Sequence, residues 1–269
     1  MKKKKIAFGL IVAIFLIFVF GSIFGRLFTE RIGVIEIEGV VTDSKEILEQ
    51  IEQFKEDDGV KGVIVRIDSP GGASAPCQEI HKELKKLREK KKVFVSMGSV
   101  CASGGYYIAV AGEKIYAMPS TITGSIGVLV EQIVVEDLLK KIGLQANTIK
   151  AGEYKDTGSP FRKMKDEEKA YLKNIIDVIH EQFIEDVAKG RNIPLDKAKE
   201  ISDGRIFTGS MAKEYKLIDK IGTFYDAVED LRLLLNIKGK PQLVYAKKRI
   251  SMLRWLISFF FEEVTRDLR

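Results

Sequence analysis

The sequence predicts an α/β protein with a largely parallel sheet, and three observations support that fold class. Apolar runs of strand length alternate with longer, charged amphipathic segments along most of the chain. Two of these runs end in glycine pairs, where the chain can turn sharply. No internal repeat is visible, and 269 residues are ample for one core. Strands separated by helical segments indicate βαβ units, and these units build a parallel sheet.

The individual elements follow from local composition. Runs rich in Val, Ile and Phe predict strands at 33–39, 60–67, 92–98, 114–118 and 126–130. Amphipathic or charged segments predict helices at 76–91, 106–111, 134–142, 166–191 and 210–216, with another starting at Pro194. Capping-box chemistry predicts one more helix opening within 42–48. Pro76 stands at the start of its helix, where proline is best tolerated.

The N-terminal 29 residues predict a membrane anchor. Ile6–Phe24 is a run of 19 residues without charge, preceded by Lys2–Lys5 and followed by Arg26. About 20 helical residues span a bilayer. A cleaved signal peptide is the alternative, but the run is longer than a usual signal-peptide core and no Ala-x-Ala pattern follows it. The excess of positive charge before the run predicts a single-pass cell-membrane protein with a cytoplasmic N-terminus and its main domain outside.

Charge and cysteine content exclude several classes of partner. The net charge is +6, and about +2 remains once Lys2–Lys5 are set aside. No basic patch interleaved with aromatic residues is present, so we expect no nucleic-acid partner. Cys77 and Cys101 could pair in an oxidising compartment, but we expect both to be small buried residues. No cluster has metal-ligand spacing, so neither a metal nor another cofactor is expected.

The stretch around Ser103 predicts a nucleophile. It follows the strand at 92–98 through small residues and precedes a helix that begins at Tyr106. Such an elbow lifts a side chain out of the fold and aims free backbone N–H groups at one point. The alternative is that Ser103 caps the helix and that the glycines serve packing.

A second turn, Asp68-Ser-Pro-Gly-Gly72, ends the strand at 60–67. Tandem glycines let the backbone approach a bound group with an N–H exposed, which suits half of an oxyanion hole. Because active sites in parallel α/β folds gather at the carboxyl ends of strands, this turn and the Ser103 elbow are expected to be neighbours.

A nucleophilic serine needs a base, and the chain has two histidines, His81 and His180. Neither stands near a glycine turn or a strand end in the sequence, so both are interpreted as structural and a Ser-His-Asp triad is disfavoured. A lysine can act instead if burial lowers its pKa from about 10.4. Lys155 is the best candidate, in the loop 151–161 that follows a strand-like run at 146–150.

Five motifs together resemble the signal peptide peptidase A family over about residues 33–235. They are Asp68-Ser-Pro-Gly-Gly72, Ala102-Ser-Gly-Gly-Tyr-Tyr107, Thr123-Gly-Ser-Ile-Gly-Val128, Gly152-Glu-Tyr-Lys155 and Gly204-Arg-Ile-Phe-Thr-Gly209. The resemblance implies a membrane-bound Ser-Lys protease with a ClpP/crotonase-like fold of repeated β-β-α and βαβ units. Cys101 is a modest departure, because a small apolar residue is commoner there.

The resemblance also assigns roles to single residues. It implies Ser103 as nucleophile, Lys155 as general base and Ser125 as the hydroxyl that positions the lysine amine. The N–H groups of Gly72 and Gly104 become the expected oxyanion donors. Ring-like homo-oligomers with sites at or near subunit boundaries are implied as well.

The sequence therefore predicts an anchor at 1–29, a protease domain at 30–248 and an amphipathic tail at 249–269. The tail carries Trp255 and Phe259–Phe261. It is too short to span a membrane, so it either lies in the interface, docks on a neighbouring subunit or completes the core. The expected function is a membrane-anchored serine endopeptidase that degrades cleaved signal peptides. A crotonase-like acyl-CoA enzyme and a non-catalytic membrane scaffold are the alternatives.

Overall fold

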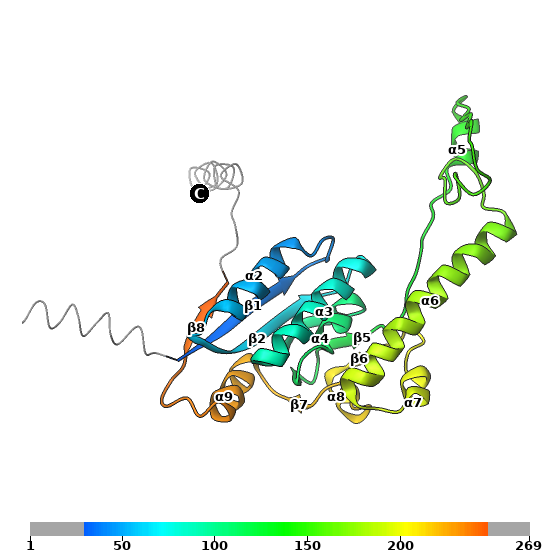
Figure 1. Ribbon diagram of the computed structural model, residues 1–269. Coiled ribbons are helices and arrows are strands. Elements are labelled where there is room, and N and C mark those ends of the chain that lie inside the picture. The colour runs from blue at the N-terminus through cyan, green and yellow to red at the C-terminus, as the bar shows by residue number, and fades with distance from the viewer. Residues whose placement is uncertain (1–29, 247–269) are drawn as a thin grey trace, which may run out of the picture.

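The computed structural model describes residues 30–246 (Figure 1). The strands are β1 (Arg31–Glu38), β2 (Val60–Ser69), β3 (Lys92–Ala102), β4 (Lys114–Ala117), β5 (Ile122–Gly124), β6 (Ile206–Thr208), β7 (Lys220–Ile221) and β8 (Gln242–Tyr245). The helices are α2 (Lys45–Glu56), α3 (Ser74–Lys90), α4 (Gly104–Ala109), α5 (Glu136–Lys141), α6 (Asp166–Arg191), α7 (Leu195–Glu200), α8 (Gly209–Glu214) and α9 (Phe224–Leu234).

The described strands form one mixed sheet in the order β6-β5-β3-β2-β1-β8, and β4 pairs with β3 and β7. Every pair is parallel except β5 with β6. The long strand β3 pairs with β4 through its first half and with β5 through its last three residues. The predicted α/β class with a largely parallel sheet is confirmed, and the carboxyl ends of β2 and β3 lie side by side.

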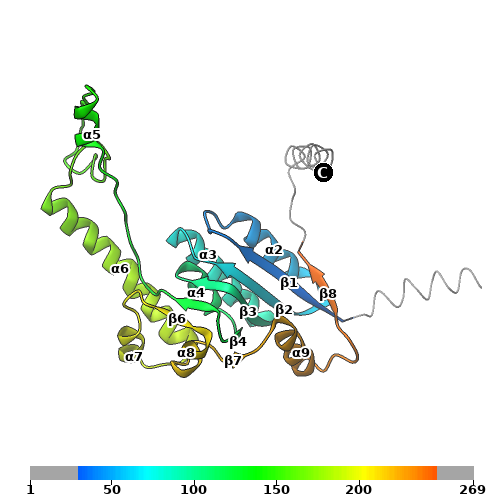
Figure 2. The same ribbon diagram turned by 180° about the vertical axis from the view of Figure 1, so that it is seen from behind.

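Each face of the sheet packs against helices (Figures 1 and 2). Val63 and Val65 point into the larger core, which β2 and β3 share with α2, α3 and α4. Ile64, between them, points the other way and packs with Phe94 and Tyr116 beneath α9. This alternation is the period of two that a strand imposes on its side chains. Both cysteines are free and buried, as expected.

A long arm projects from the body (Figures 1 and 2). After β5 the chain runs outward without regular structure, forms α5 and a series of turns at the far end, and returns as α6. Helix α6 begins and ends where the sequence predicts. The Glu168 carboxylate accepts the backbone N–H of Lys165 at its start, and Asn192 ends it with a φ of 50°.

Several boundaries differ from the sequence expectations. Strand β3 continues four residues beyond the predicted end at Gly98, because its end pairs with β5 and extends the ladder. The runs 126–130 and 146–150 are not strands, since they pair with no other strand within residues 30–246. The capping box expected within 42–48 is also absent. Helix α2 starts at Lys45, and its N-cap Ser44 instead donates a hydrogen bond to Glu79 on α3.

The expected anchor at 1–29 and the expected tail at 249–269 both lie outside the described residues. Within residues 30–246, no helix has the length and apolar character needed to cross a membrane.

Candidate active site

Ser103 occupies a strained elbow between β3 and α4. Its backbone has φ 51° and ψ −124°, a conformation that costs a non-glycine residue about 1–3 kcal/mol and persists only where the surroundings impose it. The Ser103 amide donates a 2.8 Å hydrogen bond to the Gly124 carbonyl, and its carbonyl accepts one of 2.9 Å from the Tyr107 amide. The elbow predicted from the sequence is therefore present, fixed on one side by β5 and on the other by the first turn of α4.

The Pro70-Gly71-Gly72 turn packs directly against this elbow. A methyl group on Gly71, whose φ is 103°, would lie 2.6 Å from the Gly104 nitrogen. A methyl group on Gly72 would lie 2.0 Å from the Val41 carbonyl oxygen. Both positions need glycine because backbone atoms lie where a side chain would start, so the turn and the elbow are the neighbours that the sequence predicted.

Two backbone N–H groups are available beside Ser103. Val41 forms a parallel bridge opposite Gly72, but the two bonds of that bridge use the Gly71 carbonyl and the Ala73 amide. The Gly72 N–H takes no part in it. Gly104 is the first residue of α4, and the first N–H groups of a helix have no partner within the helix. Both glycines line the same pocket as Ser103, an arrangement suited to an oxyanion.

Ser125 lies in the same cavity as Ser103, a space of about 450 Å³. It too has a positive φ, of 49°. Its amide donates a 2.8 Å hydrogen bond to the Arg205 carbonyl, and the Gly204 amide donates one of 3.1 Å to Ile126. The pairing of β5 with β6 therefore brings the motifs at 123–128 and 204–209 together at the cavity.

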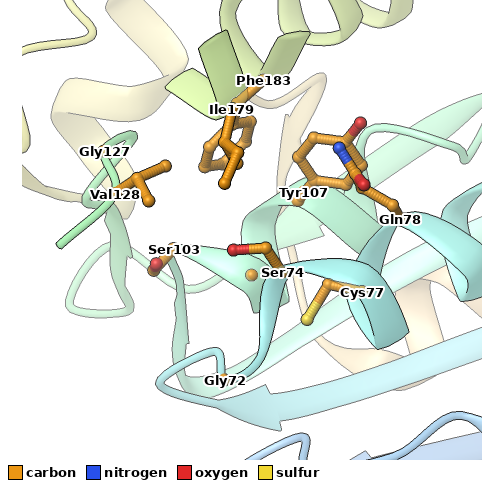
Figure 3. Close-up of a pocket in the computed structure, with 11 residues that line it drawn as sticks. Gly72, Ser74, Cys77, Gln78, Ser103, Tyr107, Gly127, Val128, Ile179 and Phe183 are labelled. Atoms are coloured by element: carbon orange, nitrogen blue, oxygen red, sulfur yellow. The ribbon is translucent and has the colours of Figure 1, made fainter. Parts of the chain in front are cut away.

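A small pocket of about 30 Å³ opens next to Ser103 (Figure 3). Its apolar lining comes from α3, α4, α6 and the chain after β5, namely Cys77, Tyr107, Val128, Ile179 and Phe183. The Tyr107 ring packs 4.7 Å from the Phe183 ring, and its hydroxyl donates a hydrogen bond to Asp186. Burial, followed by the bond to Asp186, raises the pKa of Tyr107, so this wall of the pocket stays uncharged.

His180 also lines the larger cavity, which corrects the expectation that it stands apart from any glycine turn. Its Nε2 lies 3.2 Å from the Ile126 carbonyl oxygen. A carbonyl accepts only, so this nitrogen carries the proton and donates. His180 thereby holds the segment that carries Ser125. The sequence held one signal for this position. His180 is four residues after Ile176 and three before Phe183, so it shares their helical face, which turns toward the body of the protein.

His81 fits the structural interpretation. It is 5% exposed, and its Nδ1 donates to the Tyr107 carbonyl at 2.8 Å. Burial lowers the pKa of His81. It lines neither cavity beside Ser103.

Lys155 lies elsewhere. It is exposed and belongs to the turns between α5 and α6, at the far end of the arm (Figures 1 and 2). Its amide donates to the Gly152 carbonyl at 3.3 Å. Neither cavity beside Ser103 includes it. Within the chain, the structure brings together Ser103, Ser125 and the two glycines, and it keeps Lys155 apart from them.

The end of the arm is held by ion pairs around Arg162. Its guanidinium contacts the Asp156 carboxylate at 2.7 Å and the Glu168 carboxylate at 2.5 Å. Lys150 pairs with Asp156 from the other side. Hydrogen bonds from Arg162 lower the pKa of Asp156 and bring that of Glu168 to about 2. Lys155 therefore lies in a turn that is held together by ion pairs.

Among residues 30–246, no group of three or more His, Cys, Asp or Glu could hold a metal ion.

Comparisons with known proteins find similar chains among peptidases. Residues 85–238 match peptidase family S49, a segment that includes Ser103, Ser125 and Lys155. A Synechocystis protein provisionally named protease slr0021 is 44% identical over 200 residues, which cover 74% of this chain and 72% of that protein. A protein of Enterococcus faecium provisionally named signal peptide peptidase SppA is 35% identical, covering 76% of this chain and 63% of its own.

The chloroplastic serine protease SPPA of Arabidopsis thaliana is also 35% identical, over 76% of this chain. The matched region is 30% of that longer protein. The chain therefore spans less than two thirds of some of the relatives that it matches.

Proposed function

The chain belongs to peptidase family S49, and from that premise we propose that it is a membrane-anchored serine endopeptidase that degrades cleaved signal peptides with a Ser-Lys dyad. One observation carries the proposal: the strained Ser103 stands beside the unengaged N–H groups of Gly72 and Gly104. A nucleophile and two donors that share one pocket are the parts acyl transfer needs.

The chemistry would proceed in two steps. The Ser103 hydroxyl attacks the substrate carbonyl carbon, and its proton passes to the neutral amine of Lys155. The oxyanion that forms is stabilised by the two backbone donors, each contributing roughly 3 kcal/mol. Lysine then gives the proton to the leaving amine as the C–N bond breaks, and water releases the acyl group by the same route in reverse. Ser125 would hold the lysine amine in position.

The dyad requires a second copy of the chain, because Lys155 lies on the arm and not in its own cavity. The arm of a neighbour would bring Lys155 to Ser103 and exclude water from it. Support comes from the apolar side chains that are exposed between β5 and α6, namely Leu129, Val130, Ile133, Val134, Leu138, Ile142, Leu144 and Ile149. An apolar surface of this extent marks an interaction site. A homo-oligomer is therefore part of the proposal.

His180 is the rival base, since it faces the cavity within the same chain. Because its Nε2 donates to the Ile126 carbonyl, Nδ1 is the ring nitrogen left with a lone pair to accept a proton. Replacing Lys155 separates the two assignments, because a His180 base would leave activity largely intact.

An apolar peptide is the substrate class that the cavity supports. The pocket beside Ser103 has room for a small apolar side chain. Gly127–Leu129 lines the larger cavity and belongs to no helix or strand, so its backbone groups are open to pairing with an extended peptide. The apolar run at 6–24 would keep the enzyme at the membrane, where cleaved signal peptides remain.

A serine-directed fluorophosphonate probe and a signal-peptide substrate test the proposal. The wild-type chain, with its N-terminal segment and in detergent, should hydrolyse the peptide and take the label, and Ser103→Ala should do neither. Hydrolysis of acyl-CoA esters with no peptide cleavage would support the crotonase-like alternative. Absence of both activities and of labelling would support a scaffold.

A further inference from the structure

Ser74 is a polar group beside the nucleophile that the dyad and the two glycine donors leave unused. It is the first residue of α3 and lines both the small pocket and the larger cavity together with Ser103. Figure 3 shows its hydroxyl turned toward Ser103, on the side of the pocket where Gly72 leads into α3.

A structural role does not account for this orientation. The N-cap of α3 is Ala73, and no side chain caps the helix. Ser74 stands one residue too late to do so. Within residues 30–246, its hydroxyl has no hydrogen-bond partner, while nearby Ser69 bonds to the Gly39 carbonyl and Ser44 to Glu79. The Ser74 hydroxyl is therefore free to bond with a molecule in the cavity.

The surroundings indicate a negatively charged oxygen as that partner. Apart from Ser103 and the Gln78 amide, which donates to Gln182 on α6, the pocket is lined by apolar side chains and by glycines. The N-terminus of the 17-residue α3, with its uncapped N–H groups, adds a positive potential at the same place. A hydroxyl that donates there complements negative charge developing at the substrate carbonyl.

We propose that Ser74 is a third oxyanion donor, whose hydroxyl donates a hydrogen bond to the carbonyl oxygen of the tetrahedral intermediate formed at Ser103. The inference rests on the proposed peptidase function and deepens it. Ser74 acts in the transition state, where the oxygen carries its charge, and contributes little to binding of the intact peptide. It is in this sense a catalytic residue.

The test compares Ser74→Ala with Ser74→Thr, which keeps a hydroxyl, and with Ser210→Ala. Ser210 is an exposed serine near the start of α8 that lines neither cavity beside Ser103, so its variant is the matched control. For Ser74→Ala we expect kcat to fall about 10-fold or more with KM within about twofold, since a donor used only in the transition state affects kcat. Ser74→Thr should recover much of the rate, and Ser210→Ala should match the wild type.

Two inhibitors distinguish an oxyanion donor from a residue with a purely structural role, which would not change their relative inhibition constants. A peptide aldehyde adds to Ser103 and forms an oxyanion, whereas the matching peptide alcohol cannot. In Ser74→Ala the inhibition constant of the aldehyde should rise by the factor by which kcat falls, and that of the alcohol should stay the same. An unchanged kcat, or equal weakening of both inhibitors, would overturn the proposal. A wild type that neither cleaves peptide nor reacts with the fluorophosphonate would refute the peptidase function instead.

Discussion

The sulfur atom of Cys77 lies next to Gly104, where a side chain on that residue would have to go. A methyl group on Gly104 would come within 2.5 Å of that sulfur and 3.2 Å of the Gly72 nitrogen. The thiol therefore leaves no room for a side chain at Gly104. Burial raises the pKa of Cys77 to about 11, so the contact is with a neutral thiol.

This contact predicts that Cys77→Ala partly rescues Gly104→Ala. The added methyl group should push the amide out of place and lower kcat about 100-fold, the effect of losing one oxyanion donor. Removing the sulfur leaves the Cys77 Cβ at 3.4 Å, an acceptable contact. The double variant should then regain at least about 10-fold, whereas Cys77→Ala alone changes kcat little. A double-mutant cycle on kcat measures the coupling, and purely additive losses would show that the sulfur does not set the position of Gly104.

The separation of Ser103 from Lys155 predicts complementation between inactive variants. Ser103→Ala and Lys155→Ala should each abolish peptide hydrolysis while leaving the fold and oligomer size unchanged. Assemblies formed from an equal mixture should recover up to about a quarter of wild-type activity, because one in four random neighbour pairs contributes both an intact Ser103 and an intact Lys155.

Subunit exchange is the necessary control for this experiment, and differently tagged chains followed by native mass spectrometry would measure it. Specific activity should also fall when the wild type is diluted below its assembly threshold. Mixed assemblies that contain both variants but remain inactive would argue for a base within the same chain.

A third prediction concerns the arm. Arg162→Ala removes the cation between Asp156 and Glu168, leaving the buried Glu168 carboxylate without its ion-pair partner. Hydrogen exchange over residues 150–168 should rise and activity should fall, while the melting temperature of the body changes little, because the arm projects away from it.

Lys163→Ala is the matched control for the arm. Lys163 is the next residue, its side chain is 75% exposed, and its ion pair with Asp137 spans 3.9 Å. Its loss should leave both exchange and activity unchanged. Equal effects of the two substitutions would mean that the ion pairs around Arg162 do not organise the turn that carries Lys155.

The sequence predicted much of the sheet because strand signals in a parallel fold are local. The runs before Asp68 and Ser103 are strongly apolar and end in glycine pairs, so both the strands and their shared edge could be placed. Strand β8 was missed, because Gln242–Tyr245 is a short run whose partner β1 lies some 200 residues earlier. The run at 126–130 was wrongly predicted as a strand. It has the apolar composition of a strand, but its side chains line a cavity and the arm and do not pack on a sheet.

The site was predictable to the extent that it is built from turns. Gly72 and Gly104 each belong to a glycine pair at the end of a strand. A glycine pair in that place predicts the sharp turn and the close backbone approach that the structure has. His180 reaches the site across 54 residues through a single hydrogen bond to Ile126, and Ser74 through the direction of one side chain. Such contacts depend on tertiary packing, which no local pattern encodes. The position of Lys155 was likewise not predictable, because it depends on the chain leaving the body after β5 and returning only with α6.

The arm should also resist acid in a way that depends on Arg162. Hydrogen bonds from Arg162 bring the pKa of Glu168 from an ordinary 4.5 to about 2, and they lower that of Asp156 as well. A lowered pKa in the folded state means that the stabilisation is fully present above pH 4.5 and is lost as the pH falls toward 2. Protection of residues 150–168 should therefore persist at pH 4 in the wild type. In Arg162→Ala it should already decline near pH 4.5. Hydrogen exchange corrected for intrinsic rates measures both, and a wild-type arm that opens at pH 4.5 would contradict the role given to Arg162.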